Sequence, residues 1–151
     1  MLALHLVLVG GMALYILFTL YFITGIIRLK KYSITTERLP SVSVIVAARN
    51  EEESLPALLN DLSLQDYPND KIQFIIADDR SNDATWDIIQ KQSIQDDRYT
   101  GVRITELSAK MSPKKHALTQ AILQSKNEII LATDADCRLP EGWVTTMVNP
   151  L

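Results

Sequence analysis

Apolar, β-branched stretches alternate along the chain with stretches of helical periodicity. The apolar runs of strand length are residues 41–48, 71–78, 101–107 and 127–133. The segments that follow them carry apolar residues every three or four positions, which predicts helices. These predicted helices are residues 54–65, 81–92, 113–124 and 141–148. A strand thus returns roughly every 30 residues, the size of a βαβ unit, and predicts an α/β fold with a mostly parallel sheet covered on both faces.

The first 27 residues differ from the rest because they contain no Asp, Glu, Lys or Arg. At 1.5 Å per residue, a helix of this length crosses a hydrocarbon core of about 30 Å. We therefore expect one transmembrane helix over residues 1–27 and a polar juxtamembrane linker over residues 28–40. Basic residues follow the apolar run, so the positive-inside rule predicts an outside N-terminus and a cytoplasmic globular domain. A cleaved signal peptide and a very apolar buried helix are the alternatives.

Net charge and cysteine content limit which binding partners and which cellular compartment the chain suits. The formal net charge is −3. A nucleic-acid surface would need a basic stripe, so we expect no nucleic-acid partner. Cys137 is the one cysteine of the chain, so no disulfide can form within it, which suits a reducing compartment.

Acidic residues follow three of the four predicted strands. The three segments are Ala48–Glu53, Asp78–Asp83 and Asp134–Asp136. Because the carboxyl ends of parallel strands meet at one edge of a sheet, we expect these acids to gather there, where either solvent screens them or a cation joins them. In an extended chain, Asp134 and Asp136 would face one way and Ala135 the other, an arrangement that suits Mg²⁺ or Mn²⁺. A solvated acidic turn is the alternative.

The sequence excludes two common phosphate-binding loops. Outside the apolar N-terminal segment the only glycines are Gly101 and Gly142, so neither a dinucleotide fingerprint nor a P-loop can form. Phosphate would have to be held by a metal ion and by side chains. Lys114 and Lys115 open the predicted helix 113–124, where the positive end of the helix would assist them. A solvated basic turn is the alternative.

Four segments together resemble the nucleotide-binding half of family 2 glycosyltransferases, which are inverting enzymes with a GT-A fold. They are VSVIVAARNEEESLPALLNDL, IIADDRSNDATWDII, PKKHALTQAI and ATDADC, and the resemblance runs from Ser41 to Trp143. The order and spacing of the segments carry the resemblance. It implies a Rossmann-like GT-A half, in residues 41–151, that binds a nucleotide sugar and a divalent cation (Mg²⁺ or Mn²⁺).

The resemblance also implies roles for individual positions. Asp79, with Asp78 beside it, would meet the base or ribose, Asp134 the ribose and Asp136 the metal. The positions expected at the nucleotide sugar are Ala48, Arg49, Asn50, Glu51, Asp78, Asp79, Lys114 and Asp134. The metal would neutralise charge on a departing UDP while an acceptor hydroxyl attacks the anomeric carbon from the opposite face. The acceptor would be a saccharide or a lipid-linked molecule.

Three positions depart from the pattern of the family. Arg80 and Pro113 stand where it has Gly, and Thr119 stands where it has Asn. The acceptor half and the catalytic base would lie beyond residue 151. A membrane-anchored nucleotide-binding fragment without transfer activity is therefore the alternative function. A receiver-like phosphoacceptor domain is disfavoured, because its acid pair would follow the first strand, where this chain has Arg49 and Asn50.

Overall fold

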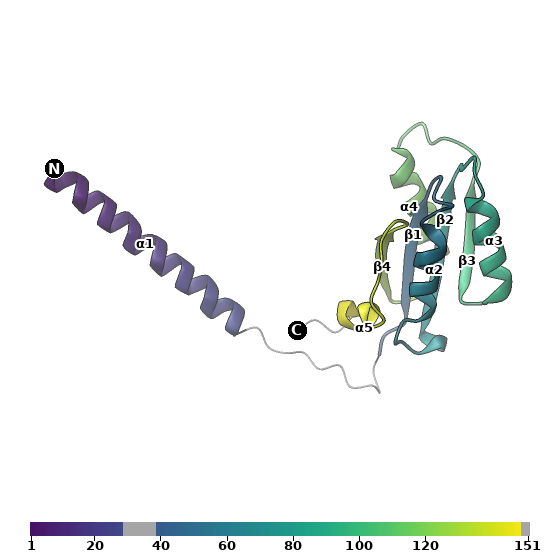
Figure 1. Ribbon diagram of the computed structural model, residues 1–151, viewed down its shortest axis with the longest axis horizontal. Helices are drawn as coiled ribbons and strands as arrows, with labels where there is room; N and C mark the ends of the chain where they lie inside the picture. The colour runs from purple at the N-terminus through teal and green to yellow at the C-terminus, as the bar shows by residue number, and fades with distance from the viewer. Residues whose placement is uncertain (29–38, 149–151) are drawn as a thin grey trace. The chain divides into compact units, whose positions relative to one another are not determined.

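The computed structural model describes residues 1–28 and 39–148 of the chain. They fall into two units, the N-terminal helix and an α/β unit, each described by itself (Figure 1). Most of the expected linker, residues 28–40, lies outside the described residues.

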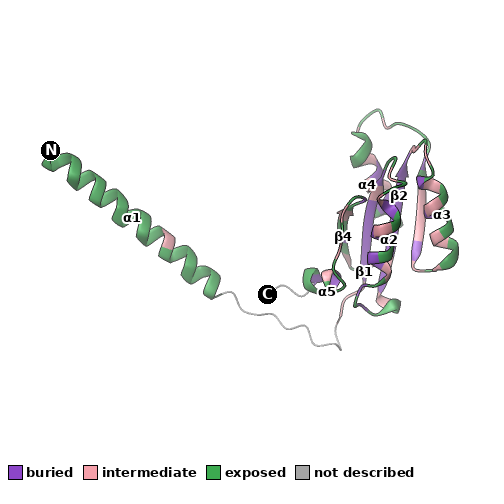
Figure 2. Cartoon of the chain, in the orientation of Figure 1, coloured by how far each residue is buried: buried purple, intermediate pink, exposed green. Residues whose placement is uncertain are grey.

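Helix α1 (Leu2–Ile27) is 26 residues long. Its side chains are exposed along the whole length, Thr19 only in part (Figure 2). The hydroxyls of Thr19 and Thr24 donate to the carbonyls of Tyr15 and Tyr21 at 2.9 and 2.8 Å, so these polar groups are satisfied within the helix. By length and composition α1 is able to cross a membrane, although a signal sequence would meet the same criterion. Its orientation in a membrane stays a prediction.

The α/β unit is built on a four-stranded parallel sheet, which confirms the predicted fold class. The strands are β1 (Val42–Ala48), β2 (Ile72–Asp79), β3 (Tyr99–Ile104) and β4 (Ile129–Asp134). Their order is β3-β2-β1-β4, so β1 and β2 are central. In the register, Ala47 lies opposite both Ala77 and Asp134, whereas Ala48 lies opposite Asp78.

Helices cover both faces of this sheet. They are α2 (Leu55–Ser63), α3 (Thr85–Gln95), α4 (Pro113–Gln124) and α5 (Trp143–Val148), with a short 3₁₀ turn, η2, at Asn69–Lys71. One core contains Val44, Phe74 and Leu58 and lies between the sheet and helices α2 and α3. A smaller core contains Ile45 and Ala117 and lies between the sheet and α4. Because strand residues alternate, successive residues of β1 and β2 serve different cores.

Three expectations about these elements need correction. The third strand begins at Tyr99 and ends at Ile104 instead of covering 101–107, and the helix expected over 81–92 begins at Thr85. Residues 81–84 are instead used in loop-to-loop hydrogen bonds described below. Strand β4 is not covered on both faces: Ile130 is 41% exposed. Gly101 of β3 admits the close approach of α3, since a Cβ there would lie 2.9 Å from Ile89.

Candidate functional site

A cleft opens at the carboxyl end of the sheet, between β1 and β4. From β1 the chain turns to β2 on one side, whereas β4 is added on the other, so this is the point where strand order reverses. The cleft has a volume of about 470 Å³. Its lining residues are Ala47, Ala48, Arg49, Glu51, Asp79, Ser112, Pro113, Lys114, Asp134, Ala135 and Asp136.

The neighbouring acids Asp78 and Asp79 point to opposite faces of the sheet. Asp79 shares the face of Ala77, which α4 covers, and it lines the cleft. Asp78 shares the face of Ile76, which α2 and α3 cover, and its carboxylate accepts a hydrogen bond from the Ser81 N–H at 3.2 Å. The structure therefore does not place Asp78 among the lining residues.

Two arginines surround the carboxylate of Asp79. Arg80 Nε donates to Asp79 Oδ1 at 2.8 Å, and Arg49 Nη1 lies 4.0 Å from Asp79 Oδ2. Arg80 has φ = 57°, the left-handed conformation that glycine adopts without steric cost. The glycine of the family pattern thus matches the backbone here, and Arg80 accepts the strain while its side chain pairs with Asp79.

The loop after β1 and the loop after β2 are joined by reciprocal hydrogen bonds. We call this region the loop junction; it consists of residues 50–52 and 81–85. Asn50 N–H donates to Ser81 Oγ, and Asn82 N–H donates to Asn50 Oδ1, both at 2.9 Å. Glu51 N–H donates to Thr85 Oγ1 at 2.8 Å. Asn50 therefore holds the two loops together and is not a lining residue of the cleft.

Two acids of the loop junction, Glu52 and Asp83, accept hydrogen bonds from backbone N–H groups. Asp83 accepts from Glu52 N–H at 3.2 Å and from Thr85 N–H at 3.0 Å, and Glu52 in turn accepts from Ala84 N–H at 2.9 Å. Desolvation acts to raise the pKa of Asp83, but these hydrogen bonds outweigh it and hold the pKa below its ordinary value. For Glu52 and Asp83, backbone N–H groups therefore supply part of the compensation that was expected from solvent or from a cation.

The amino-terminal end of α4 forms the opposite wall of the cleft. Ser112 and Pro113 bring the backbone to it, and Lys114 Nζ lies 2.7 Å from Asp134 Oδ1. The hydrogen bond to Asp134 raises the pKa of Lys114 above its ordinary value. Both side chains remain more than half exposed, at 63% and 57%, so this ion pair is open to competing ligands.

The Asp134–Asp136 segment is a turn and not an extended strand end. Strand β4 stops at Asp134, and Cys137 N–H donates back to the Asp134 carbonyl at 3.3 Å. Asp134 and Asp136 are exposed and line the cleft, as does Ala135, which is only 3% exposed. Ala135 belongs to the core that faces α2 and α3, so its burial agrees with the expectation that it faces away from the two exposed aspartates.

The oxygen atoms of the cleft fit a hard cation that takes some of its ligands from the protein and the others from a bound anion. Within the described residues, no three His, Cys, Asp or Glu side chains come together as a metal-binding group. Asp134 and Asp136 supply oxygen, the donor that Mg²⁺ and Mn²⁺ prefer, and these ions commonly take further ligands from phosphate and water. Four acids and two bases line the cleft, an excess of two negative charges. A diphosphate would meet repulsion there unless a cation accompanied it.

The cleft collects seven of the nine residues predicted from the sequence. They are Ala48, Arg49, Glu51, Asp79, Lys114, Asp134 and Asp136. Asn50 and Asp78 are the two that it does not collect. The prediction missed Ala47, Ser112, Pro113 and Ala135 as lining residues. Ser112 and Pro113 could have been found from the predicted start of the helix at residue 113. In a parallel α/β fold, the start of a helix lies near the carboxyl edge of the sheet, so its first residues come close to the strand ends.

Comparison with known proteins identifies the family to which the chain belongs. A model of the family described as "Glycosyl transferase family 2" matches residues 43–151. The chain belongs to glycosyl transferase family 2. This confirms the resemblance and the predicted enzyme class.

Two curated relatives show how much of a family 2 protein the chain represents. It is similar to the beta-monoglucosyldiacylglycerol synthase of Trichormus variabilis, with 32% identity over 73% of this chain and 23% of the relative. It is also similar to the beta-1,3-glucosyltransferase WfaP of Escherichia coli, with 34% identity over 72% of this chain and 38% of the relative. The chain thus spans about a quarter to two fifths of the length of these family 2 relatives.

Two solved structures share the fold of the α/β unit. The mannosyltransferase PcManGT of Pyrobaculum calidifontis, in complex with GDP-Man and Mn²⁺, has a TM-score of 0.67 and 28% identity, over 87% of this chain and 38% of its own. The Staphylococcus aureus TarS fragment 1–349 with UDP-GlcNAc has a TM-score of 0.55 and 28% identity, over 67% of this chain and 28% of its own.

Proposed function

We propose that this chain binds the donor of a metal-dependent inverting glycosyltransferase, and that the donor is a UDP-sugar. The observation that carries the proposal is the cleft at the β1–β4 switch point, which gathers Asp79, Lys114, Asp134 and Asp136 from three separate segments. Family membership supports the reaction class, and the cleft supports the proposed location of the donor.

The proposed roles are those that the family resemblance implies, and the position of each side chain in the cleft supports them. Asp79, fixed by Arg80, accepts hydrogen bonds from the base or the ribose. The backbone of Ala48 and Arg49, with the Glu51 side chain, forms the wall against the nucleoside, and Asp134 faces the ribose. Lys114 approaches the diphosphate at the positive end of α4. Asn50 and Asp78 support the loops that carry these groups.

We assign Asp136 as the protein ligand of the divalent cation. Its side chain is exposed on the turn after β4, in the cleft, and the excess negative charge of the lining favours cation entry. When bound, Mg²⁺ or Mn²⁺ would neutralise negative charge on the departing nucleoside diphosphate. The Mn²⁺ named with GDP-Man in the PcManGT structure supports this choice of cofactor.

Transfer itself we propose for the whole protein and not for the described residues alone. We assign no described residue as the base that deprotonates the acceptor. If the chain acts without further sequence, the donor would bind without transfer. The name of the synthase relative, and an α1 that is able to cross a membrane, favour a lipid or lipid-linked acceptor over a soluble saccharide. We place the α/β unit in the cytoplasm, with the N-terminus outside.

Calorimetric titration of UDP into the detergent-solubilised chain tests the proposal. We expect binding with Mn²⁺, much weaker binding with EDTA, and loss of the Mn²⁺-dependent part in Asp136→Ala. Asp97→Ala is the matched control, because Asp97 is exposed and lies outside the cleft. A folded wild-type chain that binds neither UDP nor GDP with Mn²⁺ would overturn the proposal. Binding of GDP alone would overturn only the choice of UDP.

A further inference from the structure

The carboxyl-terminal end of α2 holds the segment that follows the cleft acids. Asp61 accepts from Arg138 Nε at 2.6 Å, from Arg138 Nη2 at 3.0 Å and from Leu139 N–H at 3.0 Å. Asp61 is only 7% exposed, although it is charged. A carboxylate so removed from water needs partners to offset its desolvation, and here three N–H donors supply them.

One turn further along the chain, Gln65 fixes the continuation of the same segment. Its side-chain amide donates to the Pro140 carbonyl at 2.9 Å and accepts from Val144 N–H at 3.0 Å. The backbone adds a hydrogen bond from Asp66 N–H to the Glu141 carbonyl at 2.8 Å. We call Asp61, Gln65 and Arg138 the α2 clamp. It joins residues more than 70 positions apart in sequence.

The α2 clamp lies directly after the proposed metal ligand. Asp136 sits on a turn with one end anchored in β4 at Asp134 and the other at Arg138, two residues later. Asp136 itself is exposed and appears in none of the side-chain hydrogen bonds found among the described residues. Its direction is therefore set by the two ends of the turn. Of these, the Arg138 end depends on α2, an element outside the cleft lining.

We propose that Asp61 and Arg138 are positioning residues, which hold the turn so that the Asp136 carboxylate meets the cation in the cleft. This rests on the proposed function, because it takes Asp136 as the metal ligand. Groups that orient a metal ligand through a second contact change metal affinity by about 10- to 100-fold when removed. Neither Asp61 nor Arg138 touches the cation or the nucleotide.

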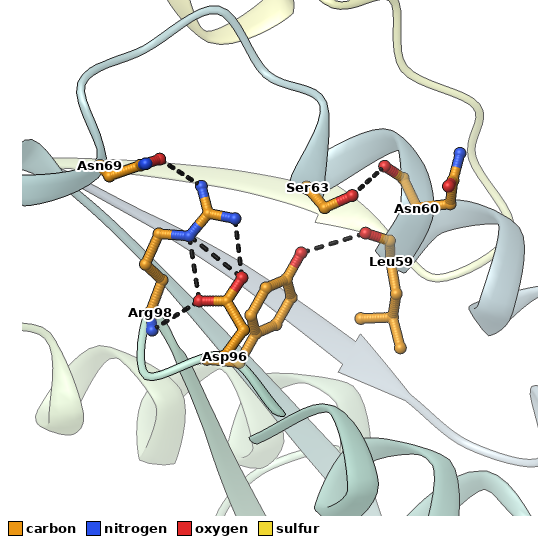
Figure 3. A network of polar contacts seen from close by, with 7 residues as sticks. Leu59, Asn60, Ser63, Asn69, Asp96 and Arg98 are labelled. Carbon is orange, nitrogen blue, oxygen red and sulfur yellow. Dashed lines mark hydrogen bonds and ion pairs between the residues drawn. The ribbon is translucent and has the colours of Figure 1, made fainter. Parts of the chain in front are cut away.

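A second pair in the same chain has nearly the same donors but lies elsewhere. Asp96 accepts from Arg98 Nε at 3.0 Å, from Arg98 Nη2 at 2.7 Å and from a backbone N–H, that of Arg98, at 3.0 Å. Figure 3 shows this pair, with Arg98 also bonded to Asn69. It joins the end of α3 to the start of β3, outside the cleft lining. Asp96→Asn therefore reproduces the loss of an aspartate–arginine pair without touching the turn at Asp136.

The test compares Asp61→Asn with Asp96→Asn in the solubilised 151-residue chain. For each, UDP binding is measured over a range of Mn²⁺ concentrations and in EDTA, together with the melting temperature. We expect both variants to melt below wild type. Only Asp61→Asn should raise the Mn²⁺ concentration for half-maximal UDP binding, by about tenfold or more, while residual binding in EDTA stays as in wild type.

Arg138 provides an independent variant, because its side chain is 71% exposed and it lies outside helix α2. Arg138→Gln should show the same Mn²⁺ shift, and Arg138→Lys, which keeps the charge, a smaller one. Equal Mn²⁺ dependence in wild type, Arg138→Gln and Asp61→Asn would overturn the positioning role and leave the donor site standing. A wild-type chain without Mn²⁺-dependent binding would overturn the proposed function, and this inference with it.

Discussion

Acidic residues occupy both the loop junction and the cleft, yet their surroundings differ. In the loop junction, Asp83 and Glu52 accept hydrogen bonds from backbone N–H groups of the facing loop. In the cleft, Asp134 has one exposed lysine partner and Asp136 is exposed. The two regions lie at the same edge of the sheet. The difference teaches that an acid at a strand end is a candidate metal ligand only when the fold leaves its oxygens unsatisfied, as it does for Asp136.

The comparison predicts that substitutions in the two regions will lower different quantities. Substitutions in the loop junction should lower stability, because they leave a backbone donor without an acceptor. Substitutions in the cleft should lower affinity for the nucleotide and the cation with little change in stability.

The largest effect is expected in the loop junction. Thr85→Val keeps the shape of a fully buried side chain but removes the oxygen that accepts from Glu51 N–H. We expect a loss of about 1–3 kcal/mol in the free energy of unfolding. Chemical unfolding measures it, with UDP titration well below the melting temperature as the companion. Weakened UDP binding at unchanged stability would contradict the assignment of Thr85 to the supporting loops.

In the cleft, Asp134→Asn should lower the affinity for UDP and leave stability nearly unchanged, the reverse of Thr85→Val. The exposed pair with Lys114 contributes little to stability, so the melting temperature should stay near that of wild type. We expect Mn²⁺-dependent UDP affinity to fall by at least about tenfold, which is about 1.4 kcal/mol. A rise in affinity would instead show that Asp134 only neutralises Lys114.

Arg80 precedes the loop junction in sequence and pairs with Asp79 of the cleft, and two substitutions separate the effects of its backbone and its side chain. Arg80→Gly and Arg80→Ala both remove the bond to Asp79, but only glycine relieves the left-handed conformation at φ = 57°. We expect the glycine variant to be more stable than the alanine variant by about 1 kcal/mol, measured by chemical unfolding. Equal stabilities would show that the backbone at residue 80 relaxes.

Lys114 and Lys115 offer a matched pair in the wall of the cleft. Both are exposed and adjacent at the start of α4, but only Lys114 lines the cleft. Lys114→Gln should weaken UDP binding by up to about fivefold at low salt, and less at high salt, whereas Lys115→Gln should not change it. Titration at two salt concentrations measures this. Equal losses in both variants would indicate a diffuse basic surface instead of a defined contact.

The pH dependence of stability distinguishes a held acid from an exposed one. Hydrogen bonds from Arg138 lower the pKa of Asp61 from 3.8 to about 2 in the folded chain. Asp61 therefore contributes stability that is full above the unfolded pKa and is lost as pH falls toward 2. The melting-temperature difference between wild type and Asp61→Asn should be constant above about pH 5 and shrink below pH 4. A constant difference down to pH 2 would contradict the assigned ion pair.

Much of the fold could be predicted from the sequence because the signals are local. The predicted helix 113–124 coincides with α4, and four apolar runs correspond to the four strands. The cleft residues at strand ends were also predictable, since parallel topology gathers them. The start of α3 was not, because residues 81–84 resemble a helix start in composition. Their hydrogen-bonding partners lie about 30 positions away in sequence.

What could not be predicted depends on distant contacts. Asp78 and Asp79 look equivalent in sequence, and only the position of α4 decides which of them faces the cleft. Ala135, although buried, still borders the cleft because strand β4 ends at Asp134 and the chain turns there. The residues of the Asp61–Arg138 pair lie 77 positions apart, and no local sequence pattern predicts their contact.

The strand order β3-β2-β1-β4 has a consequence for the time at which each region forms. A ribosome releases β1, β2 and β3 in succession. Strand β2 pairs with β1 and β3 pairs with β2, so the loop junction can assemble early. Strand β4 is synthesised last of the four and pairs with β1 across more than 80 intervening residues. The cleft is therefore completed last, when Asp134 and Asp136 are added to a sheet that is already in place.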